Sequence, residues 1–318
     1  MSIIIALFLA LNMGLSGFAV AFAPSFGSGI VSFRKAGILF TVLVIIGAVL
    51  LSGRVSKTLG VKLLNGQAID QIGGMIILIA AGTTIFISNI LKIPQSTSVV
   101  TVAAIAGVGV YFGSLNLIIL ERIIIFWVLM SLAAYTISFF LMEYLYPPTN
   151  KNMHLYEKIL AKNKIMRKIT LYINSYNAVG IGTNNVANVV APIVSMGLLS
   201  VNSGITLFAP FFGIGALLFG KQIINKTGKE LVPLGSVAGL IVSLVSTTMI
   251  FVSSLLAMPA PYVQYSMMSI LGVHTRKNSL AETFGHNYTK KLVAIWVISP
   301  VIAFLISYLL NFGIRSIL

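Results

Sequence analysis

Cysteine is absent from this chain of 318 residues, and acidic residues are scarce, with six Asp and Glu against 21 Lys and Arg. Without cysteine the chain forms no disulfides, binds no metal through thiolates and carries out no thiol redox chemistry. Charged residues make up only 8% of the chain, whereas a soluble domain carries about 25%. The sequence therefore lacks the polar surface of a water-soluble protein, which excludes a separate soluble domain.

Groups suited to acid–base or metal chemistry are also few and scattered. All six acidic residues lie in loops or at the ends of apolar segments, and no two form a pair. The three histidines show no metal-ligand spacing, and no nucleophile lies beside them. A phosphate-binding loop is missing as well. We therefore expect neither an enzyme nor an ATP-driven pump, and no catalytic residues, metal site or cofactor.

Apolar residues, in contrast, make up 58% of the chain and recur in long runs. A helix of about 20 apolar residues crosses the hydrocarbon core of a bilayer. We predict an all-α polytopic membrane protein with ten apolar segments: 3–24, 37–52, 72–90, 97–118, 123–146, 169–200, 203–219, 231–256, 262–274 and 291–311.

Four of these segments are interrupted. The stretches 3–30 and 169–200 hold Gly, Ser, Asn and Pro in their middles, and the segments after Pro94 and Pro259 are short and interrupted by Gly. Unwound backbone at membrane depth is tolerated only where protein or a cavity satisfies it. The interruptions predict broken helices or re-entrant hairpins.

A basic linker, 147–168, divides the chain and holds six Lys and Arg residues against one Glu. It separates a predicted first transmembrane repeat, 1–146, from a second, 169–318. The stretch Gly14-Leu-Ser-Gly-Phe-Ala-Val-Ala-Phe-Ala-Pro24 aligns without gaps on Gly182-Thr-Asn-Asn-Val-Ala-Asn-Val-Val-Ala-Pro192, at an offset of 168 residues.

Two further correspondences between the halves keep the same order. They have offsets of 167 and then 165: Gly53-Arg54 with Gly220-Lys221, and Pro94 and Gly107 with Pro259 and Gly272. Each half has five segments, an odd number, so the second half enters the membrane from the opposite side. The sequence predicts two inverted-topology repeats.

The basic residues indicate how the chain is oriented, because cytoplasmic loops are enriched in Lys and Arg. With the linker in the cytoplasm and ten crossings, 16 of the 21 Lys and Arg residues lie inside and both termini outside. The exceptions are Arg54, Lys57, Lys62, Arg122 and Arg315. We interpret the net charge of +15 as a topology signal in a cell-membrane protein, and not as a nucleic-acid-binding surface.

Neutral polar residues gather in the interrupted segments. Hydroxyl and amide groups can hold an oxyanion without a fixed cation, helped by the unpaired N–H groups of a helix that begins in mid-membrane. The amides at 184, 185 and 188 share one helical face. The predicted substrate-binding residues are Ser16, Ser96, Thr97, Ser98, Asn184, Asn185 and Asn188.

Small residues have a second use in membrane helices, which is close helix packing. We expect packing at Gly14, Ala19, Gly107, Gly109 and Gly272. The residues predicted to act in hinges or packing are Gly14, Gly17, Gly182, Pro24 and Pro192.

Two of these motifs are similar to those of a known family. Gly182-Thr-Asn-Asn-Val-Ala-Asn188 resembles the Gly-Ala-Asn-Asp-Val-Ala-Asn signature of the inorganic phosphate transporter family, and Ile93-Pro-Gln-Ser-Thr-Ser98 resembles its Pro-x-Ser-Thr-Thr motif. The resemblance spans both halves, up to Trp296-Val-Ile-Ser-Pro300. It implies an inverted-repeat fold, an oxyanion substrate, an ion-gradient drive and a homodimer.

The chain departs from the family at both of its Asn-Asp pairs. Ser16-Gly17 stands in the first half and Asn184-Asn185 in the second, while Pro259-Ala-Pro-Tyr-Val263 replaces a second Ser-Thr-Thr. This pattern resembles the bacterial sulfate permease branch of the family. A site without aspartates repels a dianion less, but it binds Na⁺ more weakly, since hard cations favour charged oxygen ligands.

These observations predict a secondary active transporter that imports sulfate by ion-coupled alternating access, with H⁺ or Na⁺ as coupling ion. The alternative in the same class is a phosphate permease, because the amide oxygen of Asn184 or Asn185 can accept the proton of hydrogen phosphate. An anion channel without coupling is a third alternative.

Overall fold

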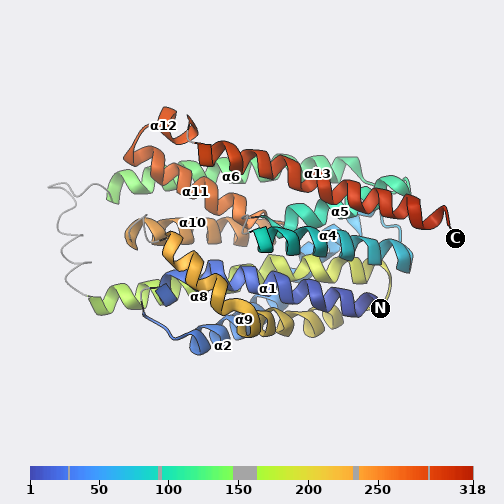
Figure 1. Cartoon of the computed structure of the whole chain (residues 1–318), viewed down its shortest axis with the longest axis horizontal. Helices are drawn as coiled ribbons and strands as arrows, with labels where there is room; N and C mark the ends of the chain where they lie inside the picture. The colour runs from blue at the N-terminus through green and yellow to red at the C-terminus, as the bar shows by residue number, and fades with distance from the viewer. Residues whose placement is uncertain (28, 92–94, 146–162, 232–235, 286, 318) are drawn as a thin grey trace.

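The computed structural model describes residues 1–27, 29–91, 95–145, 163–231, 236–285 and 287–317, and all regular structure within them is helical. Figure 1 shows long helices packed side by side, with both chain termini at one end of the molecule. The helices are α1 (Ser2–Gly27), α2 (Phe33–Gly47), η1 (Ala48–Ser52), α3 (Gly53–Gly60), η2 (Lys62–Leu64), α4 (Gln71–Leu91), α5 (Thr97–Tyr111), α6 (Leu117–Leu145), α8 (Asn163–Ser195), α9 (Val201–Leu231), α10 (Ser236–Leu255), α11 (Tyr262–Lys277), α12 (Leu280–Gly285) and α13 (Asn287–Arg315). The predicted all-α class is confirmed.

The predicted segments correspond to these helices with shifted boundaries. The segment 97–118 ends early, because a turn with Gly113 at φ +64° separates α5 from α6. Glycine suits this turn because it adopts positive φ at no steric cost. α8 begins at Asn163, inside the predicted linker, whose residues up to 162 lie outside the described residues. The short α12 had no predicted counterpart.

Seven helical spans in the described part of the chain are long and apolar enough to cross a membrane, judged by length and composition. They lie in α1, in α2 to η2 as one span, and in α4, α6, α9, α10 and α13. α5 and α11, with 15 and 16 residues, are too short to cross a core of about 30 Å. The protein is thus a multi-pass membrane protein with two helical hairpins, α4–α5 and α10–α11.

The two halves of the chain pack against each other reciprocally. α1 packs most extensively on α9, and α8 packs on α2, η1 and α3. Likewise α5 packs on α13, and α11 packs on α6. The α4–α5 hairpin lies in the half of the molecule that holds both termini, and the α10–α11 hairpin lies in the other half (Figure 1).

Four glycines repeat this correspondence residue by residue. Each meets a backbone carbonyl of a crossing helix: Gly14 that of Phe212, Gly215 that of Leu11, Gly182 that of Val44, and Gly47 that of Val179. A Cβ at any of the four would lie 2.1–2.2 Å from the carbonyl oxygen. The glycines and the residues that they meet are related by the same offset of 168 residues. Gly182 lies 168 positions after Gly14, and Phe212 lies 168 positions after Val44. Gly14 and Gly182 therefore hold helices in backbone contact.

The breaks that we predicted inside 3–30 and 169–200 are absent, because α1 and α8 are continuous helices. Pro24 and Pro192 lie close to the C-terminal ends of these helices, where a missing N–H disturbs only the last turns. Ser16 also supports continuity, because its hydroxyl donates to carbonyls of the preceding turn. The other two predicted interruptions, at Pro94 and Pro259, correspond to the breaks between α4 and α5 and between α10 and α11.

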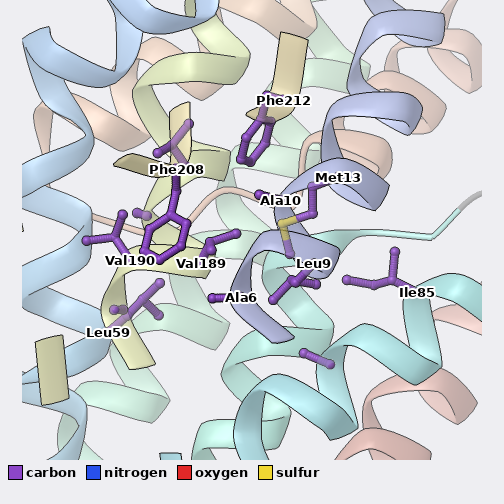
Figure 2. Packing of buried hydrophobic residues seen from close by; sticks show 14 of the residues in the cluster. Ala6, Leu9, Ala10, Met13, Leu59, Ile85, Val189, Val190, Phe208 and Phe212 are labelled. Carbon is purple, nitrogen blue, oxygen red and sulfur yellow. The ribbon is translucent and has the colours of Figure 1, made fainter. Parts of the chain in front are cut away.

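The main hydrophobic core surrounds the crossing of α1 with α9. Figure 2 shows Met13 of α1 and Phe208 and Phe212 of α9, with Val190 of α8 and Leu59 of α3 beside them; all five are fully buried. This packing holds α1 and α8 rigidly in the middle of the molecule. Beside it, α2 passes into α3 through η1, a π-helical turn of five residues.

Candidate functional site

α8 carries five asparagines that are buried in the protein. Asn185 is 6% exposed, and Asn174, Asn177, Asn184 and Asn188 are fully buried. The four fully buried amides follow spacings of three, seven and four residues, which place them on one helical face. Three of the five were predicted as site residues. Asn174 and Asn177 were missed, although their helical spacing from Asn184 was a readable signal.

Asn184 fastens the tip of the α10–α11 hairpin. Its amide nitrogen donates to Ser254 Oγ at 2.9 Å and to the Met258 carbonyl at 3.0 Å. Its amide oxygen accepts from the Ala260 N–H at 2.7 Å. The tip is held from the other side by Trp127 Nε1, which donates to the Pro259 carbonyl at 2.6 Å. Both amide hydrogens of Asn184 are therefore used within the protein.

Asn188 reaches the beginning of the other short helix, α5. Its amide nitrogen lies 3.0 Å from Ser98 Oγ and 3.5 Å from Thr97 Oγ1. Ser96 is the N-cap residue of α5, with extended backbone and no side-chain capping bond. The two predicted motifs thus meet, although about ninety residues separate them in sequence. Ser98 accepts from Asn188 and so keeps its own hydroxyl hydrogen for a further acceptor.

Several buried polar atoms at this junction have no hydrogen-bond partner in the described structure. They are the hydroxyl of Ser96 and the amide oxygens of Asn185 and Asn188. The first N–H groups of α5 also lack intrahelical acceptors, as at every helix start. An unpaired buried polar group costs about 1–3 kcal/mol. The junction therefore presents donors and acceptors that a polar ligand can satisfy.

Ser16 and Gly17 lie where α1 crosses α8, but they do not join these contacts. The Ser16 hydroxyl donates to the carbonyls of Asn12 and Met13 of its own helix, at 3.3 and 3.1 Å. A Cβ on Gly17 would lie 3.2 Å from Ile181 Cγ2. Of the seven predicted substrate-binding residues, the structure brings Asn188 to Ser98 and Thr97. Ser96 directly precedes Thr97, and Asn185 lies three residues before Asn188 on α8. The structure binds Asn184 to the opposite hairpin and leaves Ser16 on α1.

Charged side chains are absent from this junction in the described structure. The four acidic residues that it describes are exposed, and Asp70 pairs with Arg315 at the termini end of the bundle. Among the described residues no cluster of three or more His, Cys, Asp or Glu could hold a metal ion. The described part of the junction thus offers neutral hydrogen-bonding groups, a set that can hold a dehydrated oxyanion.

Comparison with known proteins places the chain in a family. The model of the phosphate transporter family matches residues 13–307, which is most of the chain. The chain belongs to the phosphate transporter family. This family consists of membrane transporters and not of enzymes. The family that the two sequence motifs predicted is thereby confirmed.

Individual relatives within the phosphate transporter family differ in the anion that their names give. The chain is 34% identical to sulfate permease CysP of Bacillus subtilis, over 97% of this chain and 86% of the relative. It is 28% identical to inorganic phosphate transporter 2-1, chloroplastic, of Arabidopsis thaliana, over 48% of this chain and 28% of the relative. A solved structure titled as the sodium-dependent phosphate transporter has the same fold, with a TM-score of 0.83 at 18% identity, covering 99% of this chain and 98% of that one.

Proposed function

We propose that this protein is a secondary active transporter that imports sulfate across the cell membrane by ion-coupled alternating access. The observation that carries the proposal is the contact of Asn188 with Ser98 at the start of α5, surrounded by buried polar atoms without partners. Sulfate is fully ionised at neutral pH, so it needs donors only, and these groups supply them without a fixed charge.

The groups divide into anion contacts and positioning contacts. The hydroxyls of Ser96 and Ser98, the first N–H groups of α5 and the amide of Asn185 contact the sulfate oxygens. Asn188 donates to the Ser98 oxygen and so leaves the Ser98 hydroxyl hydrogen to be donated to the anion. Asn184 keeps the α10–α11 tip against α8 and so positions the site without donating to the anion. Ser16 is the predicted contact from α1, although its hydroxyl bonds to carbonyls of its own helix in this structure.

Phosphate is the second candidate substrate, and one observation favours it. The amide oxygens of Asn185 and Asn188 have no donor in the described structure, and either can accept the P–O–H proton of hydrogen phosphate. The relative named as a sulfate permease, at 34% identity over nearly the whole chain, supports sulfate. The same two oxygens are neutral ligands for a coupling Na⁺, while H⁺ is the alternative coupling ion.

The proposed orientation places the linker in the cytoplasm and both termini outside. Hairpins preserve this assignment, because the α4–α5 and α10–α11 pairs each return to the side from which they start. Both termini lie at one end of the molecule, and the two hairpins lie in opposite halves (Figure 1), which supports two inverted repeats. We further propose that the transporter is a homodimer in the bilayer, as the family resemblance implies.

Uptake of radiolabelled sulfate and phosphate into proteoliposomes of the purified protein tests this proposal. Sodium and proton gradients are imposed separately, and empty liposomes provide the control. We expect concentrative sulfate uptake that depends on one gradient and exceeds phosphate uptake. Uptake of phosphate with exclusion of sulfate refutes sulfate as the substrate. Equal flux with and without either gradient favours an anion channel over a coupled transporter.

A further inference from the structure

A second polar group lies outside the candidate site, buried between α8, α10 and α11. The Tyr262 hydroxyl lies among the side chains of Asn177, Ser246, Thr247 and Ser266. Asn177, Ser246 and Thr247 are fully buried, and Tyr262 and Ser266 are 5% and 8% exposed. We refer to these five residues as the polar seam.

The polar seam lies along the same face of α8 as Asn184, because α8 and α10 pack side by side with a constant pairing of residues. Asn184 contacts Ser254, and a Cβ on Gly180 would lie 2.9 Å from Ile250 Cγ2, so each residue of α8 faces the one 70 positions later. Asn177 and Thr247 obey the same relation. A stripe of amides on α8 therefore faces a stripe of hydroxyls on α10.

Helix packing alone does not account for the polar seam. Polar residues that hold membrane helices together do so by hydrogen bonds. In the described structure neither amide atom of Asn177 makes a hydrogen bond of ordinary geometry, and the Thr247 hydroxyl makes none either. The hydroxyl of Ser246 donates to a carbonyl of its own helix. Asn177 and Thr247 thus have the Tyr262 hydroxyl close by but no hydrogen bond of ordinary geometry to it or to any other described group. A single phenol hydroxyl cannot satisfy all of these donors and acceptors, so bonding capacity remains for a ligand that passes.

The polar seam leads from the candidate site toward the linker end of the molecule. Ten residues of helix separate Asn184 from Asn174, which is about 15 Å, or half of a bilayer core of about 30 Å. Asn174 donates to Ser25 of α1, and α8 then begins with the exposed cations Lys164, Arg167 and Lys168. A polar track that ends among cations suits an anion.

We propose that the transported anion leaves the candidate site along the polar seam, with Asn177 as its next hydrogen-bond donor. This inference rests on the proposed function. The track is closed at Gly180, where even a Cβ would lie 2.9 Å from Ile250 Cγ2 and 3.0 Å from Thr247 Cγ2. The anion passes only when the α10–α11 hairpin moves away from α8, and release therefore requires that movement.

The absence of cysteine permits a direct test by single-cysteine labelling. The variants are Ser246→Cys, Thr247→Cys and Ser266→Cys, and Ser307→Cys is the control, fully buried on α13 against Gly107. A membrane-impermeant anionic methanethiosulfonate is applied from the linker side of oriented vesicles during sulfate turnover. We expect the three seam thiols to react at least about tenfold faster than Cys at position 307, and saturating sulfate to slow them. Equally slow labelling at all four positions overturns the proposal.

Asn177→Leu provides an independent measurement, with Asn311→Leu as control. Asn311 is also a fully buried asparagine with an unpartnered amide oxygen, but it lies on α13. We expect Asn177→Leu to bind sulfate within about twofold of the parent while its transport rate falls about tenfold, since one donor to a charged group is lost on the path. Parent-like transport by Asn177→Leu refutes the release path. Failure of the parent to bind sulfate refutes the proposed function instead, and the two failures are thus distinguished.

Discussion

The junction of α8 with α5 and the junction of α1 with the apolar cluster of α6, α10 and α11 residues have opposite character. In the first, the amide of Asn188 bonds to Ser98. In the second, the residue 168 positions earlier is Val20, which packs on an apolar cluster that includes Tyr262 and Tyr265. Tyr262 itself corresponds to Thr97, at the offset of 165 that relates Pro94 to Pro259.

This difference shows that the two halves share packing but not chemistry. The glycine crossings are alike on both sides, because both halves need the same backbone approach. At the first junction the amide of Asn188 meets hydroxyl groups, whereas the corresponding Val20 has no hydrogen-bonding side chain and packs against aliphatic and aromatic side chains. The two halves thus share their glycine contacts, while the proposed site lies at one junction only. The predictions that follow test this asymmetry, in order of expected effect.

The largest effect on stability is expected where the halves are equal. Gly14→Ala and Gly182→Ala each place a methyl 2.1–2.2 Å from a backbone carbonyl oxygen, which cannot turn aside as a side chain can. We expect the free energy of unfolding of each variant to fall by at least the roughly 1–3 kcal/mol typical of an overpacked core. The two losses should be similar. Thermal unfolding in detergent measures this. Gly239→Ala, with open space around its Cβ, is the control and should unfold like the parent. A large difference between Gly14→Ala and Gly182→Ala would break the packing equivalence.

Asn185→Asp should weaken sulfate binding most strongly among variants of the site. Two unit charges 4 Å apart repel by about 4 kcal/mol at an effective dielectric constant of about 20, so the loss is on the order of a thousandfold. Phosphate should be less affected, because the carboxylate accepts its proton, and a sodium dependence should appear. Isothermal titration with both anions measures this. Asn311→Asp controls for burying a charge elsewhere, and unchanged sulfate affinity in Asn185→Asp would move the site away from α8.

Asn188→Ala and Val20→Ala compare the two junctions directly. The first removes a bond that orients an anion-contacting hydroxyl, and we expect a loss of about 1.5–3 kcal/mol, or roughly ten- to a hundredfold in sulfate affinity. Val20→Ala should leave affinity unchanged, with only a small loss of stability. Equilibrium binding of radiolabelled sulfate to both variants decides the matter. Equal losses would mean that the junctions share the anion after all.

Asn184→Ala should affect stability more than affinity. It removes three hydrogen bonds to the α10–α11 hairpin, each worth about 0.6 kcal/mol between membrane helices, so about 2 kcal/mol is expected. Sulfate affinity should fall less than in Asn188→Ala. Paired measurements of melting temperature and affinity test this, and a loss of affinity without a loss of stability would make Asn184 a direct anion contact.

Much of the fold was predictable because its signals are local. Apolar runs defined the helices, and the short segments after Pro94 and Pro259 became α5 and α11. The offset of 168 residues predicted which glycines correspond. The motif at 184–188 and the one at 96–98 were identified from residue type, and the structure brings them together through Asn188.

The rest depended on tertiary contacts that no local pattern encodes. Asn184 binds backbone groups of Met258 and Ala260. Because most residue types carry these backbone groups, the sequence gives no sign of the contact. The register between Asn177 and Thr247 follows from how α10 packs on α8. The predicted breaks in α1 and α8 were wrong because Gly and Pro signal either a break or close packing, and only the packed structure distinguishes them.

The π-helical turn η1 explains why the offset between the halves changes. It equals 168 for Gly47 and Gly215 but 167 for Gly53 and Gly220, so the first half has one additional residue between these positions. η1 spans Ala48–Ser52, in that interval, whereas α9 is α-helical throughout. A π-turn accommodates one extra residue without shifting the helix on either side. η1 thus takes up the one residue by which the first half exceeds the second in this interval, and deleting Val49 should restore an uninterrupted α-helix with both flanks in place.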